Sequence, residues 1–334
     1  MPENQKPRIG VMIGDPGGIS PEICAKALAS RIPQETADVV LVGNIHVVED
    51  IVEMIGLDAN VGAVEGAEGA SDKDFIPVIE CGDLKRGEYK IAEASAASGR
   101  AAKQWFDRAD EMCKAGELDG WIMAPVNVTS MRMAGVMKEL DDLQPPDTFM
   151  LRMSGPLRIV PIAEHLQIKD VTESVTIERV LRVIRMLDDH LRRWGMENPR
   201  IGVAGLNPHA MFPFDDEVIG AATAQACEHG LDVKGPIAPD AVFRHCIEDK
   251  YDAVVSMYHD QGQIALKTAA FAGACTVFMG LGYPYLSIPH GSAYDIAGKG
   301  IAQHYSAQEA MQMAAKLASG TAFPAKSKNA GQGD

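Results

Sequence analysis

Residues 8–22 read RIGVMIGDPGGISPE. The apolar run at 8–13 predicts a buried strand, and the glycines that follow it predict a tight turn into a helix. Backbone N–H groups in such a turn can point at a ligand. Because the segment has neither the Walker A spacing nor G-x-G-x-x-G, an ordinary strand-to-helix turn explains it equally well.

Strand-like apolar runs recur along the chain, separated by longer helical patterns. They are DVVLVG (38–43), DGWIMA (119–124), LRIVPIA (157–163), RIGVAGL (200–206) and DAVVSMY (252–258). The clearest helix is predicted over residues 176–194, where apolar side chains recur every three or four positions. This alternation is typical of an α/β fold with mostly parallel strands.

Length and charge exclude several classes of protein. The chain has 334 residues, enough for two domains of roughly 150 residues each. With 31 Lys and Arg against 46 Asp and Glu, its net charge of −15 disfavours nucleic acid as a partner. No apolar stretch approaches the roughly 18 residues of a membrane span, and the first residues lack a signal-peptide pattern. The six cysteines form no C-x-x-C, so we expect reduced thiols and a cytoplasmic protein.

Three histidines follow directly after predicted strands: His165, His209 and His259. Because ligand sites in open α/β sheets lie at the carboxyl ends of strands, the three together could hold a divalent ion. Any one of them alone is more typical of a structural residue. Asp260 and Asp240 could ligate a metal, orient a histidine or accept a proton, with helix capping as the alternative for Asp240.

Two further features could bind ligands. Lys267 lies in an otherwise apolar run, where it either faces an anionic substrate or extends to the surface. The segment PHGSAYDIAGKGIA (289–302) is rich in small residues, so its backbone can approach a nucleotide while Asp295 meets ribose hydroxyls. A surface loop is the alternative for this segment.

At this point the motifs resemble a known family. HGSAYDIAGKG (290–300) resembles the cofactor loop of the isocitrate and isopropylmalate dehydrogenase superfamily, and GDPGGISPEI (14–23) resembles its N-terminal glycine motif. Together with AGLNPHA (204–210) and MYHDQGQIALK (257–267), they identify the chain as a member of the 4-hydroxythreonine-4-phosphate dehydrogenase family.

The resemblance implies an architecture. We expect a two-domain α/β/α sandwich of the isocitrate/isopropylmalate dehydrogenase-like type, which is not a Rossmann fold. Residues 1–135 and 290–324 would form a discontinuous cofactor-side domain, residues 136–289 a dimerisation and metal/substrate domain, and residues 325–334 a disordered tail. The family also implies a homodimer with each active site at the subunit interface.

The resemblance implies a set of site residues as well. NAD is the expected hydride acceptor, with NADP left open, and a divalent metal (Zn, Mg or Mn) is expected on three histidines shared between subunits, matching His165, His209 and His259. Lys267 matches the family's substrate-binding lysine, and Asp260 or Asp240 would take the proton. The implied cofactor contacts are Gly14, Asp15, Asn207, His290, Gly291, Ser292, Ala293 and Asp295.

The positions that would bind a substrate phosphate depart from the family pattern. Pro146 and Asp147 stand where the family has phosphate-binding His and Thr, and Thr276 and Tyr285 stand where it has Asn and Arg. Losing these charge-assisted donors predicts a non-phosphorylated substrate. We therefore expect oxidation of a secondary alcohol in a small hydroxy acid or diol, such as a cis-dihydrodiol dicarboxylate, with decarboxylation. This expectation is similar to the terephthalate dihydrodiol dehydrogenase branch of the family.

Three alternatives stay open. Arg132 and Lys138 could supply the phosphate contacts, which would make the protein a 4-hydroxythreonine-4-phosphate, 4-phosphoerythronate or 4-phosphothreonate dehydrogenase. The fold could instead belong to a non-catalytic protein that binds metal or nucleotide. A zinc hydrolase is the third possibility, because three histidines with an open position also generate hydroxide.

Overall fold

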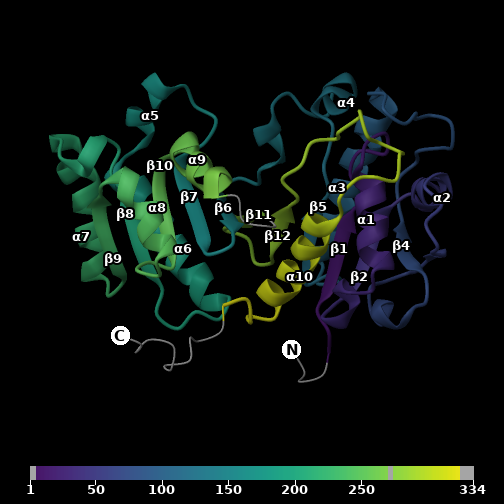
Figure 1. Cartoon of the computed structure of the whole chain (residues 1–334), viewed down its shortest axis with the longest axis horizontal. Helices are drawn as coiled ribbons and strands as arrows, with labels where there is room; N and C mark the ends of the chain where they lie inside the picture. The colour runs from purple at the N-terminus through teal and green to yellow at the C-terminus, as the bar shows by residue number, and fades with distance from the viewer. Residues whose placement is uncertain (1–4, 270–273, 324–334) are drawn as a thin grey trace. The chain divides into compact units, whose positions relative to one another are not determined.

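The computed structural model describes residues 5–269 and 274–323. Contacts divide the chain into two compact units, labelled by element in Figure 1. Unit 1 holds the described residues up to Thr148 and those from 274 to Ala318, and unit 2 holds those from Phe149 to 269 and from Ser319 to 323. The expected boundaries near 135 and 289 differ from this division, because residues 136–148 and 274–289 pack with unit 1. The tail predicted for residues 325–334 lies outside the described residues.

Unit 1 is built on a mostly parallel sheet. Its strands are β1 (Arg8–Met12), β2 (Asp38–Gly43), β3 (Val61–Ala63), β4 (Ile76–Glu80), β5 (Gly120–Met123), β11 (Cys275–Met279) and β12 (Tyr285–Ser287). They run in the order β3-β4-β2-β1-β5-β12-β11, and β11 pairs antiparallel with β12. β1 lies between β2 and β5 and is almost wholly buried, as expected for a central parallel strand covered on both faces.

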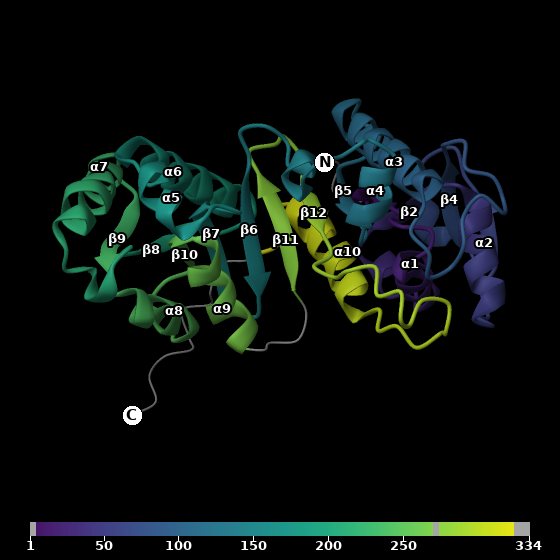
Figure 2. The same ribbon diagram turned by 90° about the horizontal axis from the view of Figure 1, so that it is seen from above.

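Helices cover both faces of this sheet. They are α1 (Ser20–Ala29), α2 (Ile45–Met54), α3 (Ala96–Lys114), α4 (Val128–Met133) and α10 (Tyr305–Ala318), with the short helices η1 (Pro33–Glu35), η2 (Ala70–Asp72) and η3 (Leu140–Leu143). Figure 2 shows α3 and α4 on one face and α1 and α10 on the other. The side-chain oxygen of Ser95 caps α3 by accepting a 3.0 Å hydrogen bond from the N–H of Ser98.

Unit 2 contains a further run of mostly parallel strands. Its strands are β6 (Phe149–Ser154), β7 (Leu157–Ala163), β8 (Arg200–Ala204), β9 (Asp232–Ile237) and β10 (Ala253–Tyr258), in the order β6-β7-β10-β8-β9. β6 and β7 form an antiparallel hairpin, whereas β7, β10, β8 and β9 are parallel. The carboxyl ends of β7, β10 and β8 therefore lie side by side at one edge of the sheet.

The helices of unit 2 also cover two faces. They are α5 (Ile168–Ser174), α6 (Ile177–Arg193), α7 (Ala221–Glu228), α8 (Pro239–Ile247) and α9 (His259–Ala269), with the short helices η4 (Pro208–Ala210) and η5 (Asp215–Gly220). In Figure 2, α5, α6 and α7 lie on one face of the sheet and α8 and α9 on the other. α6 confirms the predicted helix over 176–194, and the side chain of Thr176 caps it by accepting from the N–H of Arg179.

The expected mixed α/β fold is confirmed. Each of the six cysteines is free, in agreement with the predicted reduced thiols. Across residues 5–269 and 274–323, none of the helices is long and apolar enough to cross a bilayer.

Candidate functional site

Two of the predicted histidines meet at one edge of the unit 2 sheet. His165 follows β7 and His259 follows β10 directly, and these strands are parallel neighbours. The centroids of the two imidazole rings are 5.3 Å apart. Ligand atoms of His165, His259 and the neighbouring Glu164 all lie within 4.8 Å of one another. Two imidazoles and a carboxylate at this separation suit a divalent transition metal with positions open to other ligands.

Asp260 orients one of these histidines. Nδ1 of His259 lies 2.7 Å from Oδ1 of Asp260, and since a carboxylate only accepts, the imidazole donates. This contact leaves Nε2 as the nitrogen of His259 that could bind a metal, the arrangement in which metal-ligating histidines are usually held. Of the three roles considered for Asp260, this contact supports orientation of a histidine.

Glu164 is already engaged by an arginine. Both terminal nitrogens of Arg152 donate to it, at 2.9 Å to Oε1 and 2.8 Å to Oε2. The two side chains are 8% and 13% exposed, so the pair is almost buried. Because both oxygens of Glu164 accept from Arg152, a metal ion bound here would compete with this ion pair for the carboxylate. Neither residue was predicted from the sequence, although a lone charged residue in the buried strand FMLRMS (149–154) was a usable signal.

His209 lies outside this cluster. It is exposed and lies within η4, where its backbone takes a left-handed conformation with φ 59° and ψ 5°. The neighbouring Asn207, a predicted cofactor contact, donates through both its backbone and side-chain nitrogens to Asp215. One chain therefore brings together two of the three predicted metal-binding histidines.

The other predicted catalytic side chains are exposed. Lys267 lies on α9, the helix that begins at His259. Asp240 lies in the first turn of α8 and is not part of the His165–His259 cluster. The structure thus associates Lys267 with the element that carries a candidate metal ligand, and Asp240 with a different helix.

The two predicted cofactor segments meet within unit 1. The N–H of Ile19 donates to the carbonyl of Ser292, and a Cβ added to Gly18 would lie 2.9 Å from that same oxygen. Gly14 has φ 87°, and a Cβ there would lie 2.5 Å from the carbonyl oxygen of Pro125. The glycines at 14 and 18 are therefore required by close backbone approach, which brings the 14–18 turn against the 290–295 loop.

Asp15 is the most unusual residue of these segments. It is 1% exposed, and burial raises the pKa of its carboxyl, although the hydroxyls of Tyr294 and Ser292 oppose the rise. Its Oδ2 atom makes no hydrogen bond of ordinary geometry with any described residue. A buried carboxylate oxygen without a hydrogen bond can accept one from a ligand hydroxyl.

The remaining predicted cofactor contacts lie in the 290–295 loop. His290, Gly291 and Asp295 are exposed, and no heavy atom lies within 4 Å of a Cβ built on Gly291. Partial burial lowers the pKa of His290. Ala293 has a left-handed backbone with φ 42°. The loop therefore offers open backbone and side chains to a ligand.

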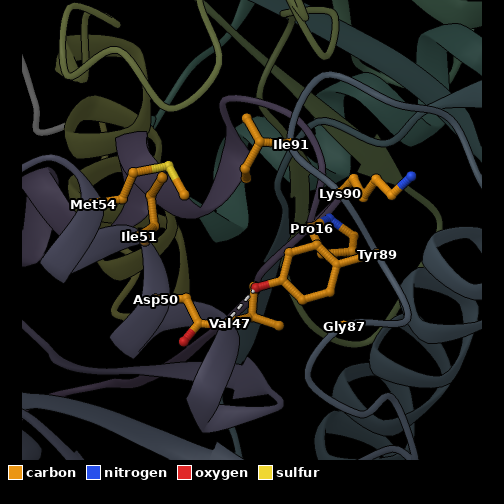
Figure 3. Close-up of a pocket in the computed structure, with 9 residues that line it drawn as sticks. All are labelled: Pro16, Val47, Asp50, Ile51, Met54, Gly87, Tyr89, Lys90 and Ile91. Atoms are coloured by element: carbon orange, nitrogen blue, oxygen red, sulfur yellow. Dashed lines mark hydrogen bonds between the residues drawn. The ribbon is translucent and has the colours of Figure 1, made fainter.

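A cavity of about 390 Å³ borders the glycine turn (Figure 3). It is lined by Pro16 of the glycine turn, four residues of α2 (Val47, Asp50, Ile51 and Met54) and Gly87, Tyr89, Lys90 and Ile91. The hydroxyl of Tyr89 donates to Asp50 at 3.1 Å. A Cβ on Gly298 would lie 2.8 Å from Sδ of Met54, so the 290–300 segment also packs on this wall.

The predicted substrate contacts fall into two groups. Pro146 and Asp147 are exposed. Thr276 is buried in β11, and Tyr285 is fully buried between Phe278 and Trp121, with ring centroids 4.2 and 4.1 Å away. Tyr285 therefore has no exposed surface with which to meet a substrate.

Arg132 and Lys138, the alternative phosphate contacts, are exposed neighbours. The guanidinium of Arg132 donates to the carbonyl of Lys138 at 2.6 Å and pairs with Glu139 at 3.0 Å. Two cations thus lie close together on the surface of unit 1.

Comparison with known proteins decides the family. The profile of the family described as pyridoxal phosphate biosynthetic protein PdxA matches residues 35–314. The chain belongs to the PdxA family. A relative from Novosphingobium aromaticivorans, provisionally named 4-hydroxythreonine-4-phosphate dehydrogenase, is 38% identical over 322 residues, covering 96% of this chain and 98% of the relative.

Other relatives carry closely related names. A protein of Clostridium botulinum strain Langeland, provisionally named D-threonate 4-phosphate dehydrogenase, is 34% identical and covers 94% of this chain and 97% of its own length. The crystal structure of 4-hydroxythreonine-4-phosphate dehydrogenase from Klebsiella pneumoniae matches with a TM-score of 0.84 at 32% identity, over 95% of this chain and 99% of that one. These matches confirm the expected fold class, and they show that the relatives of this PdxA-family chain are dehydrogenases acting on a CH–OH group.

The expected substrate is wrong. We predicted a non-phosphorylated substrate with decarboxylation, but the relatives just described are named for phosphorylated substrates. The structure of terephthalate 1,2-cis-dihydrodiol dehydrogenase from Burkholderia xenovorans, the branch that we had favoured, matches less well, with a TM-score of 0.69 at 25% identity over 93% of this chain and 98% of that one. The prediction failed for a physical reason. Tyr285 and Thr276 are buried, so the residue types at these positions reflect packing inside unit 1 and not recognition of phosphate.

Proposed function

We propose that this protein is an NAD-dependent, divalent-metal-dependent dehydrogenase that oxidises the secondary alcohol of 4-hydroxythreonine 4-phosphate or D-threonate 4-phosphate. The observation that carries the proposal is the pairing of His165 with His259 at the carboxyl ends of two neighbouring parallel strands. Membership of the PdxA family and the names of the relatives support the substrate class.

The donor set of unit 2 fits a divalent ion. His165 and His259 would hold it through imidazole nitrogens, and His209 would supply the third imidazole from the second subunit of a homodimer. Such an ion supplies Lewis acidity to an alcohol oxygen. Asp260 accepts from Nδ1 of His259 and would thereby leave Nε2 to hold the ion.

Several exposed polar side chains would handle substrate. Lys267 presents an ammonium group on the same helix as His259 and would pair with an anionic group of the substrate. Arg132 and Lys138 are candidate contacts for the phosphate. Asp240 is the remaining candidate for proton acceptance, because the carboxylate of Asp260 already accepts from His259.

The cofactor segments of unit 1 fit a dinucleotide. The turn at 14–18 brings backbone close to the 290–295 loop, where an added Cβ would be blocked. Asp15 offers a buried carboxyl oxygen without an ordinary hydrogen bond, and Asp295 is exposed for ribose hydroxyls. The preference for NAD over NADP is part of the proposal.

The test is formation of NADH, followed at 340 nm. Each phosphorylated substrate is compared with its dephosphorylated counterpart, with added Zn²⁺, Mg²⁺ or Mn²⁺ and with chelator. We expect turnover of the phosphorylated compounds, loss of activity with chelator and in His259→Ala, and normal activity in His229→Ala, which alters an exposed histidine of unit 2 outside the cluster. Turnover of only the dephosphorylated compounds, or none despite bound metal and NAD, would contradict the proposal.

A further inference from the structure

A fully buried carboxylate lies beneath the loop that carries His209. Asp215, the first residue of η5, is 0% exposed. It accepts hydrogen bonds from the backbone N–H groups of Leu206 at 2.7 Å, Asn207 at 3.2 Å and Phe212 at 3.4 Å, and from Nδ2 of Asn207 at 3.0 Å. All of these donors belong to residues 206–212, which we call the His209 loop.

The His209 loop has a costly backbone conformation. His209 and Ala210 are consecutive non-glycine residues with φ values of 59° and 53°. Left-handed residues of this kind persist only where the surrounding structure over-determines them, and they concentrate at functional sites. A Cβ on Gly205 would lie 2.6 Å from the Cβ of Ala210, so the loop doubles back onto the end of β8 and requires glycine there.

The base of the His209 loop is tied to the helix of His259. The side chain of Gln261 donates from Nε2 to the carbonyl of Gly205 at 2.9 Å and accepts at Oε1 from the N–H of Met257 at 2.7 Å. The His209 loop is therefore held at its base by the first turn of α9 and along its length by Asp215.

We propose that Asp215 is a positioning residue, which holds the His209 loop so that His209 is presented outward as a metal ligand for the second subunit. The inference rests on the metal dependence of the proposed function. A carboxylate can accept all of these hydrogen bonds, whereas an amide at the same position would turn its own NH₂ group toward two of the donors. Asp215→Asn therefore loosens the loop while keeping the volume of the side chain.

The experiment compares Asp215→Asn and Asp215→Ala with wild type and with Asp216→Asn, a matched change at the exposed neighbouring carboxylate. Hydrogen exchange in the metal-free dimer reports the amides of Leu206, Asn207 and Phe212, with those of β10 as the internal reference. Titration with Zn²⁺ against a chromogenic chelator gives metal affinity, and steady-state kinetics give kcat at each metal concentration.

We expect faster exchange at the His209 loop in Asp215→Asn, normal exchange in β10, and metal affinity lower by about 10- to 100-fold. Raising the metal concentration should restore kcat, and Asp216→Asn should match wild type throughout. If Asp215→Ala does not fold, Asp215→Asn decides the matter.

Unchanged exchange at the His209 loop in Asp215→Asn would overturn the proposal, whatever the metal affinity. Faster exchange with unchanged metal affinity would also overturn it, because Asp215 would then serve only local stability. If the wild-type protein binds none of Zn²⁺, Mn²⁺ and Mg²⁺, both the proposed function and this use of His209 are refuted. The titration of wild type shows this outcome before any variant is compared.

Discussion

The contact between His259 and Asp260 allows a sharp test of how the candidate metal cluster is organised. Asp260→Ala removes the acceptor that lies 2.7 Å from Nδ1 of His259. Removing such an orienting partner typically lowers metal affinity by about 10- to 100-fold, and each factor of ten corresponds to about 1.4 kcal/mol. Because the side chain of Asp260 is 68% exposed, solvent screens the pair, and we expect an effect near the lower end of that range.

The assay must separate orientation from proton transfer. Metal affinity is measured by chelator competition on the metal-free protein, and kcat is measured at saturating metal. If Asp260 orients His259, affinity falls, kcat at saturating metal is largely retained, and Asp260→Asn, which keeps an acceptor oxygen, recovers part of the loss. The reverse pattern would refute this reasoning: unchanged affinity with kcat lower by about 10²- to 10⁴-fold, the usual effect of losing a general base. Asp232→Ala, at an exposed carboxylate on β9, is the control.

Three further predictions concern the residues around the candidate sites. Tyr285→Ala should lower the free energy of unfolding by about 3–5 kcal/mol in urea titrations, because the ring is fully buried against Trp121. Tyr285→Phe should lower it by about 1 kcal/mol or less, since the hydroxyl's contacts are 3.5 Å long. A small effect of the alanine variant would contradict the importance of this packing. Burial raises the pKa of Asp15, so its ionisation opposes folding. Wild type should lose stability relative to Asp15→Asn as pH rises above about 4, where unfolded aspartate ionises. A difference in unfolding free energy between the two proteins that stays constant across pH would show this reasoning to be wrong. Arg152→Met should lower the free energy of unfolding by about 3–5 kcal/mol, because it leaves Glu164 nearly buried without its partner. The double variant Arg152→Met/Glu164→Met should recover most of that loss. If the losses of the two single variants simply added, the two side chains would not be coupled.

The placement of His165 and His259 at the same edge of a parallel sheet was predictable from sequence. Each follows an apolar run, and in a parallel sheet such runs end at the same edge, so both imidazoles had to face one side of unit 2. The order of the strands was not predictable, because the apolar pattern of β10 does not show that it lies between β7 and β8. That order decides which strand ends are neighbours.

The polar partners of these histidines were harder to predict. The sequence pattern does not distinguish Asp215 from Asp216, yet Asp215 is fully buried and Asp216 is exposed. The difference arises from the tertiary position of η5 beneath the His209 loop. The pairing of Arg152 with Glu164 was likewise not predictable, because residues that are 12 apart share no local pattern.

The substrate was predicted wrongly because position in a motif was taken as evidence of contact. We expected Tyr285 to stand in the place of a substrate-binding arginine of the family, but its ring stacks between Trp121 and Phe278. An aromatic residue at this place is explained by the packing of β12 against β5 and β11. Its presence therefore carries no information about whether the substrate bears a phosphate.

The conformation of His209 is better explained by function than by packing. An exposed side chain gains little from burial, so the fold has no packing reason to hold His209 and Ala210 in left-handed conformations. A fully buried carboxylate and a tightly fitted glycine nevertheless maintain this arrangement. If His209 served only its own chain, relaxing the loop would stabilise the protein at no cost to the His165–His259 pair. A ligand presented to a second subunit gives the strained conformation a use, and this is why the exchange rates of the His209 loop and the metal affinity should change together.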